Sequence, residues 1–148
     1  MRDTNAVAAL TEGRVLAALV TTGLTVAIPF GVARYDLVVD LGEAGLKRVQ
    51  CKTGRLRRGA IVYNVTSVHR RDGAWARRAY QGEADYFGIY CPDTDKVYLV
   101  PVGSSAGRGS LRVEATLNGR KAGICWAEEY QVKPDSIPVA MQQELDFT

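Results

Sequence analysis

Long hydrophobic runs are missing from this chain of 148 residues. No window approaches 18 consecutive uncharged apolar residues, so a membrane-spanning helix is not expected. The segment Met1–Asn5 carries an acid and polar residues where a secretory signal needs basic charge followed by an apolar run. We therefore expect a cytoplasmic protein that has no membrane partner.

Cysteine and histidine are scarce. The three cysteines, Cys51, Cys91 and Cys125, form no CxxC pair and lie in apolar segments, which predicts buried, reduced thiols. His69 is the only histidine, and nothing resembles a zinc-ligand cluster. The sequence also lacks the GxxxxGK(S/T) phosphate loop and the GxSxG nucleophile motif, so it offers no motif for those two chemistries.

What is present fits a globular protein. Hydrophobic residues make up 47% of the chain and charged residues 24%, a balance that argues against intrinsic disorder. The length suits a single domain over residues 1–148, and we expect the polar segment 134–148 to be a loosely held tail.

The order of the predicted elements indicates an α/β (α+β) fold. Apolar residues at helical spacing predict a helix over residues 4–22, capped by Thr4 or Asn5 and ended by Gly23. Apolar and β-branched runs predict strands over 24–28, 35–41, 46–53, 60–68, 86–91 and 97–102. We expect residues 69–82 to be partly helical and 127–132 to form a short helix. The result would be a mixed sheet flanked by helices.

Positive charge is concentrated in one third of the chain. Residues 47–80 hold ten basic residues and one acid, a balance of +9, while the remainder carries −6. Most of these residues are arginines, which suit bidentate contacts with phosphate. A polyanionic partner is therefore one interpretation, and an ordinary solvated surface is the other.

Four polar residues occupy unexpected places. Glu12 falls on the apolar stripe of the first helix, where a carboxylate must be paired, protonated or bound to a cation. Asp36 opens an apolar strand, although Asp is depleted from strands. Gln50 and Lys52 lie two apart on the next strand and so share one face, with Cys51 on the other. Taken singly, each has an ordinary explanation: a solvent-reaching acid, a turn cap and the wet face of an edge hairpin.

Together, these residues resemble the PD-(D/E)xK nuclease superfamily, and within it the homing endonucleases of group I introns. The resemblance is carried by Glu12, by Gly23 and Pro29, by Tyr35-Asp36-Leu37-Val38 and by Val49-Gln50-Cys51-Lys52-Thr53. Downstream, Tyr80, Asp85-Tyr86-Phe87 and Tyr98-Leu99-Val100-Pro101 continue the pattern. One departure from the wider superfamily is Gln50, which stands where most members have an acid; the homing subgroup also has Gln there.

The resemblance implies a restriction-endonuclease-like fold and a Mg²⁺-dependent endonuclease that hydrolyses phosphodiester bonds in DNA. Its catalytic residues would be Glu12, Asp36, Gln50 and Lys52. Mg²⁺, with Mn²⁺ as a substitute, would be held by Asp36, Glu12, the Gln50 amide and the Cys51 backbone carbonyl. Lys52 would supply a fixed positive charge beside the phosphate or the attacking water.

The basic segment then has a place as the surface that binds double-stranded or branched DNA. The residues expected to contact DNA are Arg55, Arg57, Arg58, His69, Arg70, Arg71, Arg77 and Arg78. Cutting both strands of a duplex needs at least two sites, so a homodimer or homotetramer is expected. A Holliday junction resolvase-like nuclease and a DNA-binding module without catalysis are the alternatives, and a protein that binds no nucleic acid is a third.

Overall fold

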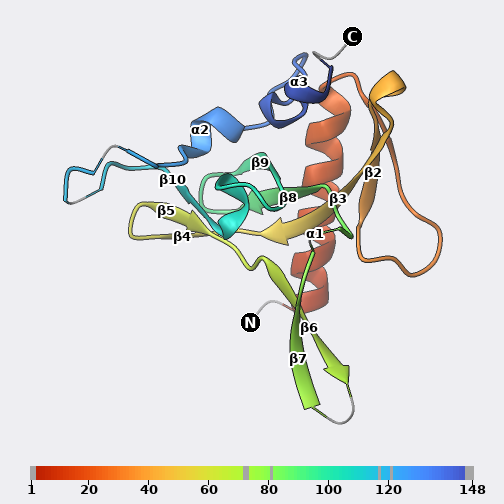
Figure 1. Cartoon of the computed structure of the whole chain (residues 1–148), viewed down its shortest axis with the longest axis horizontal. Coiled ribbons are helices and arrows are strands. Elements are labelled where there is room, and N and C mark those ends of the chain that lie inside the picture. Colours follow the sequence, from red (N-terminus) through yellow and green to blue (C-terminus); the bar gives the residue numbers. More distant parts are fainter. Residues whose placement is uncertain (1–2, 72–73, 81, 117, 121, 146–148) are drawn as a thin grey trace.

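A five-stranded mixed sheet forms the centre of the structure (Figure 1). The computed structural model describes residues 3–71, 74–80, 82–116, 118–120 and 122–145, with the backbone alone for 67–71 and 74–78. The strands, in their spatial order, are β1 (Thr25–Ala27), β2 (Leu37–Asp40), β3 (Leu46–Thr53), β8 (Tyr86–Cys91) and β9 (Lys96–Pro101). β3 and β8 are parallel, and the other neighbours are antiparallel. The expected mixed sheet is confirmed.

Helix α1 (Thr4–Thr21) packs along one face of this sheet (Figure 1). The N-cap is Asp3, whose carboxylate accepts a hydrogen bond from the Asn5 N–H at 3.1 Å. The expected caps, Thr4 and Asn5, are therefore wrong by one or two residues, because the acid just before them reaches the first free amides of the helix. Gly23, with φ of 89°, follows the helix end as expected.

Two hydrophobic cores lie on the opposite faces of the sheet. The first joins α1 to the sheet, with Val15 and Leu19 fully buried against Val49 and Cys51. The second surrounds Phe87 and Ile89 on the other face. Alternate residues of one strand enter different cores because successive strand side chains point to opposite faces.

A smaller three-stranded sheet covers part of the second core. Its order is β10 (Ser110–Arg112), β5 (Ala60–Val62) and β4 (Arg55–Arg57), and Ile61 and Leu111 are fully buried. Two short 3-10 turns, η1 (Gly42–Ala44) and η2 (Ala106–Arg108), lie in the connections.

The segment after β5 departs from expectation. The single strand expected over 60–68 is divided into β5 and β6 (Thr66–Arg71), and the segment expected to be partly helical contains strand β7 (Ala74–Ala79). β6 and β7 pair as an antiparallel hairpin that projects from the sheet (Figure 1). The basic sequence has no clear hydrophobic period, which is why the sequence did not predict this pair of strands.

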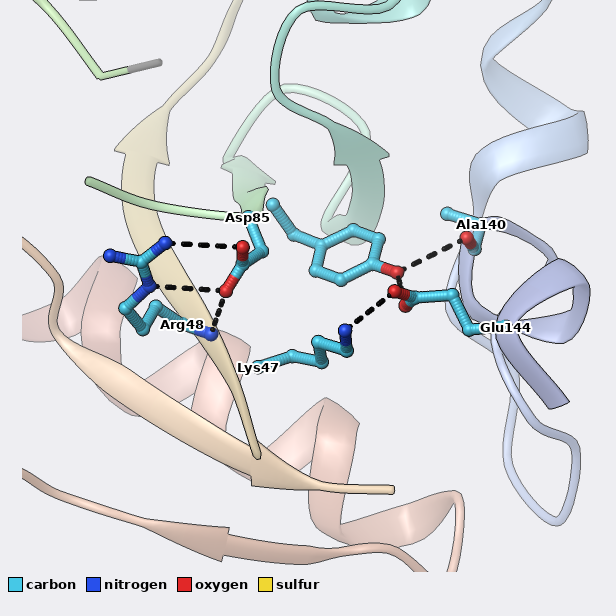
Figure 2. Close-up of polar contacts among 6 residues, drawn as sticks. Lys47, Arg48, Asp85, Ala140 and Glu144 are labelled. Carbon is cyan, nitrogen blue, oxygen red and sulfur yellow. Dashed lines mark hydrogen bonds and ion pairs between the residues drawn. The ribbon is translucent and has the colours of Figure 1, made fainter. Parts of the chain in front are cut away.

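The C-terminal segment packs onto the first core. Expected to be loosely held, it forms α3 (Val139–Leu145) after the short helix α2 (Ala127–Tyr130), and Met141 of α3 is fully buried. Glu144 pairs with Lys47 of β3 at 2.8 Å and hydrogen-bonds the Tyr86 hydroxyl (Figure 2). Within the described part of the chain, none of the helices combines the length and apolar character that crossing a membrane requires.

Candidate active site

Asp36 is fixed at the point where strand β2 begins. Its N–H donates to the Val49 carbonyl at 2.9 Å, and its Oδ2 accepts from the Cys51 N–H at 2.8 Å. Both bonds join it to β3, on which Gln50 and Lys52 lie. The second bond immobilises one carboxylate oxygen against the main chain of β3.

Glu12 of α1 lies beside Asp36. Partial desolvation of the carboxyl group, the charge of Asp36 and a hydrogen bond with its side chain together raise the pKa of Glu12, although the residue as a whole is exposed. The buried stripe of α1 passes through Thr11, Val15 and Leu19, and Glu12 is exposed at its edge. The expectation of Glu12 on the core-facing stripe is therefore wrong by one position.

No counter-charge neutralises these two carboxyl groups within the described residues, since no Lys or Arg nitrogen lies within ion-pair distance of either. Two adjacent acids without a cationic partner repel each other unless a proton or a cation is bound between them. The pair is thus suited to hold a positively charged ligand.

The main chain of Cys51 offers a further oxygen. Val49 is bonded towards β2, whereas the Gly54 N–H donates to the Tyr90 carbonyl of β8 at 2.8 Å. Main-chain groups two residues apart on a strand point to the same neighbouring strand, so the carbonyl of Cys51 points towards β2, like that of Val49. The pairing of β2 with β3 ends at Leu37 and Val49, so no residue of β2 stands opposite Cys51. Its carbonyl accepts only from the Gln50 Nε2, at 3.4 Å, among the described residues, so a lone pair is free.

Gln50 and Lys52 face the side of the sheet opposite to the Cys51 thiol, as expected. They stand beside Phe87 and Ile89 of β8, which belong to the second core, whereas Cys51 packs into the first. Burial, followed by the charges of Asp36 and Glu12, raises the pKa of the Cys51 thiol. The thiol is therefore a neutral core group. Cys91 is likewise buried, while Cys125 is only half-buried, and all three are free.

Lys52 is held by Tyr80 and by the main chain of Thr66. Its Nζ donates to the Tyr80 hydroxyl at 3.3 Å and to the Thr66 carbonyl at 3.4 Å. In the part of the chain that the structure describes, no carboxylate lies within 4.0 Å of this amine, so its charge is not cancelled by an ion pair. An ammonium in this state can stabilise negative charge on a phosphate.

A hydrogen bond between two threonines joins helix α1 to strand β3. The hydroxyls of Thr11 and Thr53 lie 2.6 Å apart, and each residue adjoins a predicted site residue, Glu12 and Lys52 respectively. This bond sets the height of α1 along β3. This bond could not be predicted from the sequence, because hydroxyl pairs between distant segments have no local pattern.

The oxygen ligands suit a hard divalent cation. Carboxylates and carbonyl or amide oxygens are the groups that bind Mg²⁺ and Ca²⁺. Over the described residues, no three His, Cys, Asp or Glu side chains gather in one place. A cation here would consequently be held by the Glu12–Asp36 pair and by the neutral oxygens of Gln50 and Cys51.

The basic residues of the predicted DNA surface are distributed over two hairpins. Arg55 and Arg57 are exposed on β4, and Arg58, with φ of 48°, lies in the turn that joins β4 to β5. Arg55 and Thr11 line the same cavity, of about 330 Å³, at the N-terminal half of α1. The backbone places His69, Arg70 and Arg71 on β6 and Arg77 and Arg78 on β7, and the side chains of these five lie outside what the structure describes.

A larger cavity, of about 630 Å³, lies elsewhere, between β9, β10 and α2. Tyr98, Arg112 and Trp126 are among the residues that line it, and the predicted site residues are not. This larger cavity is therefore separate from the paired carboxylates. We favour the carboxylate pair as the candidate active site because reaction chemistry depends on groups of the right type and position.

Comparison with known proteins agrees with the fold. The sheet, its parallel β3–β8 pair and the flanking helices form the fold of a PD-(D/E)XK nuclease. A family model described as PD-(D/E)XK endonuclease matches residues 2–133. The chain belongs to this endonuclease family.

A solved structure also matches. The bacterial homing endonuclease I-Ssp6803I superposes with a TM-score of 0.67 at 21% sequence identity, over 88% of this chain and 89% of that one. At this identity the likeness shows the fold. A search of curated protein sequences gives no match.

Proposed function

We propose that this chain is a Mg²⁺-dependent DNA endonuclease of the homing-endonuclease type. The observation that carries the proposal is the contact between the Glu12 and Asp36 carboxyl groups, which has no cationic partner among the described residues. Membership of the endonuclease family supports hydrolysis of a phosphodiester bond. The charge pattern of residues 47–80 supports DNA as the substrate.

The residues have separate tasks in this reaction. The oxygens of Asp36, Glu12, Gln50 and Cys51 would hold a divalent cation, which when bound would supply positive charge to polarise the phosphate. Asp36 is held on β3 by the Cys51 N–H, and Glu12 completes the carboxyl pair from α1. The Lys52 amine stabilises the negative charge that develops on the phosphate or orients the attacking water. Gln50 contributes a neutral oxygen, so two acids carry most of the cation binding.

DNA would be positioned by the arginines of the β4–β5 and β6–β7 hairpins, mostly through phosphate contacts. Each chain provides a single site, so cleavage of both strands calls for a homodimer or a homotetramer. The neutral Gln50 favours one further candidate, a DNA-binding module without catalysis. The two differ in whether a divalent metal produces cutting.

The test is cleavage of a supercoiled plasmid carrying a randomised insert, with Mg²⁺ or Mn²⁺ and with EDTA. We expect cutting only with metal, and we expect Lys52→Ala to slow it by about a hundredfold or more. Lys96→Ala is the matched control, because Lys96 is an exposed lysine at the start of β9. A four-way junction as a parallel substrate identifies a resolvase-like preference.

Equal nicking by the wild type and the Lys52→Ala variant would show that the assigned site is wrong. Binding of duplex DNA with no metal-dependent cutting would favour the module without catalysis.

A further inference from the structure

Tyr80 occupies a central place behind the candidate active site. Its side chain is buried, with 5% of its surface exposed, and its ring packs edge-on against Phe87 with centroids 5.8 Å apart. Its carbonyl accepts from the N–H groups of Glu83 and Ala84 at 2.8 and 3.0 Å, which anchors the turn that follows. Tyr80 is thus fixed by both its ring and its main chain.

Two cationic groups converge on this ring. The Lys52 Nζ lies 4.4 Å from the ring centroid as well as 3.3 Å from the hydroxyl, and the Arg34 guanidinium carbon is also 4.4 Å from the centroid. Arg34 is tethered further by the Ala79 carbonyl, at 3.1 Å, and by an ion pair with Glu83. Aromatic faces attract cations, and burial strengthens the attraction.

The contacts with Lys52 restrict where its amine can point. An ammonium has three N–H groups and a flexible four-carbon stem. Tyr80 and Thr66 accept two of the three hydrogens, which leaves a single N–H for a substrate oxygen or a water. The Thr66 acceptor is a main-chain carbonyl, which any residue at that position would provide. Of the two acceptors, only the Tyr80 hydroxyl therefore depends on the identity of a side chain.

We propose that Tyr80 is a positioning residue, whose hydroxyl holds the Lys52 amine in the direction that catalysis needs. The inference rests on the proposed function for the role of Lys52 in cleavage, although the contact itself does not. Arg34 lies two residues before Asp36, so the same ring also touches the segment that delivers the acidic side of the site.

The decisive variant is Tyr80→Phe, which keeps the ring, its packing on Phe87 and its attraction for cations. Tyr63→Phe is the matched control. Tyr63 is buried in the same core and also packs on Phe87 at 5.8 Å, and its hydroxyl donates to the Ala106 carbonyl at 2.6 Å. Each variant thus removes one hydroxyl from an equivalent setting, and only Tyr80 touches Lys52.

Two readouts separate positioning from a structural role. In single-turnover cleavage of the plasmid at saturating Mg²⁺, we expect Tyr80→Phe to be about tenfold slower, with plasmid affinity in EDTA unchanged. Tyr63→Phe should cleave at the wild-type rate even though both variants lose similar stability. In acetylation by acetic anhydride, followed by mass spectrometry, Lys52 should react several-fold faster in Tyr80→Phe alone, with Lys96 and Lys133 as internal references.

The outcomes decide the question in either case. Wild-type cleavage by Tyr80→Phe, or equal slowing by both variants, would overturn the proposal. If the wild-type protein cuts no DNA at all, the proposed function fails, and the acetylation of Lys52 alone decides: an unchanged rate in Tyr80→Phe then overturns the positioning contact.

Discussion

The close approach of α1 to the sheet depends on Gly88, and this leads to a stability prediction that also bears on the site. A Cβ placed on Gly88 would lie 2.6 Å from Val15 Cγ1 and 3.1 Å from Val49 Cγ1. Real methyl groups do not pack so closely, so in Gly88→Ala either the Val15 side chain or α1 itself must shift. Glu12 precedes Val15 by about one helical turn, so a shift of α1 would also change its position relative to Asp36.

The magnitude follows from two opposing effects. Forcing an extra methyl group into a packed core costs about 1–3 kcal/mol. Replacing a strand glycine recovers roughly 0.5–1 kcal/mol by restricting the unfolded chain. We therefore expect Gly88→Ala to lower the free energy of unfolding by about 1–2 kcal/mol, which for a chain of this length lowers the Tm by roughly 2–8 °C.

A double-mutant cycle tests the contact itself. Val15→Ala leaves a hole in the first core and should cost about 2 kcal/mol. In that background the new methyl group fills the space that Val15 vacated, so Gly88→Ala should become neutral or stabilising. The two changes would then be non-additive by about 1.5–3 kcal/mol. Urea unfolding followed by circular dichroism measures all four proteins.

Gly54 provides the control. A Cβ there would lie 2.7 Å from Ile61 Cγ2 and 3.0 Å from Ile89 Cγ2, on the face away from α1. Gly54→Ala should be similarly destabilising, yet additive with Val15→Ala. If Gly88→Ala and Val15→Ala add to within about 0.5 kcal/mol, α1 does not pack on Gly88 as described and the reasoning is wrong.

Two further predictions concern stability. Gly13 is exposed within α1 and an added Cβ meets nothing within 4 Å, so Gly13→Ala should raise the free energy of unfolding by about 0.5–1 kcal/mol; a loss in urea unfolding would contradict this. At Asp85, burial raises the pKa, but hydrogen bonds from the Arg48 side chain and N–H outweigh it and the net pKa is lowered (Figure 2). Its contribution is therefore present above the ordinary Asp value of about 3.9 and is lost as the pH falls through the lower folded value. Asp85→Asn should cost about 1–2 kcal/mol at pH 7, and this cost should shrink steadily as the pH is lowered below the ordinary Asp pKa; a cost that does not change across an acid titration would refute the role of the carboxylate charge.

The sequence predicts some elements closely because their patterns are local. Strands β3 and β8 begin and end at the expected residues, since each is a run of β-forming residues bounded by turn residues. The sequence did not predict the β6–β7 hairpin, because its basic residues follow neither the helical nor the strand spacing of apolar residues. Helix α3 did have a signal: Ile137, Met141 and Leu145 recur at a spacing of four and pack in or against the first core, but seven residues are too few to stand out.

In the candidate site, too, local features could be predicted from the sequence and long-range contacts could not. Asp36, Gln50 and Lys52 could be selected from the sequence because polar residues at unusual places in a strand, in a motif that resembles a known family, are visible locally. Glu12 was selected with them, although the structure places it beside the core-facing stripe rather than on it. Their environment could not be predicted in this way. The bond between Thr11 and Thr53 and the bond between Lys52 and Tyr80 each join segments whose approach is set by packing. Sequence therefore indicates which groups are capable of chemistry, whereas the direction in which each group is held depends on long-range contacts, and those contacts govern the rate if the site is catalytic.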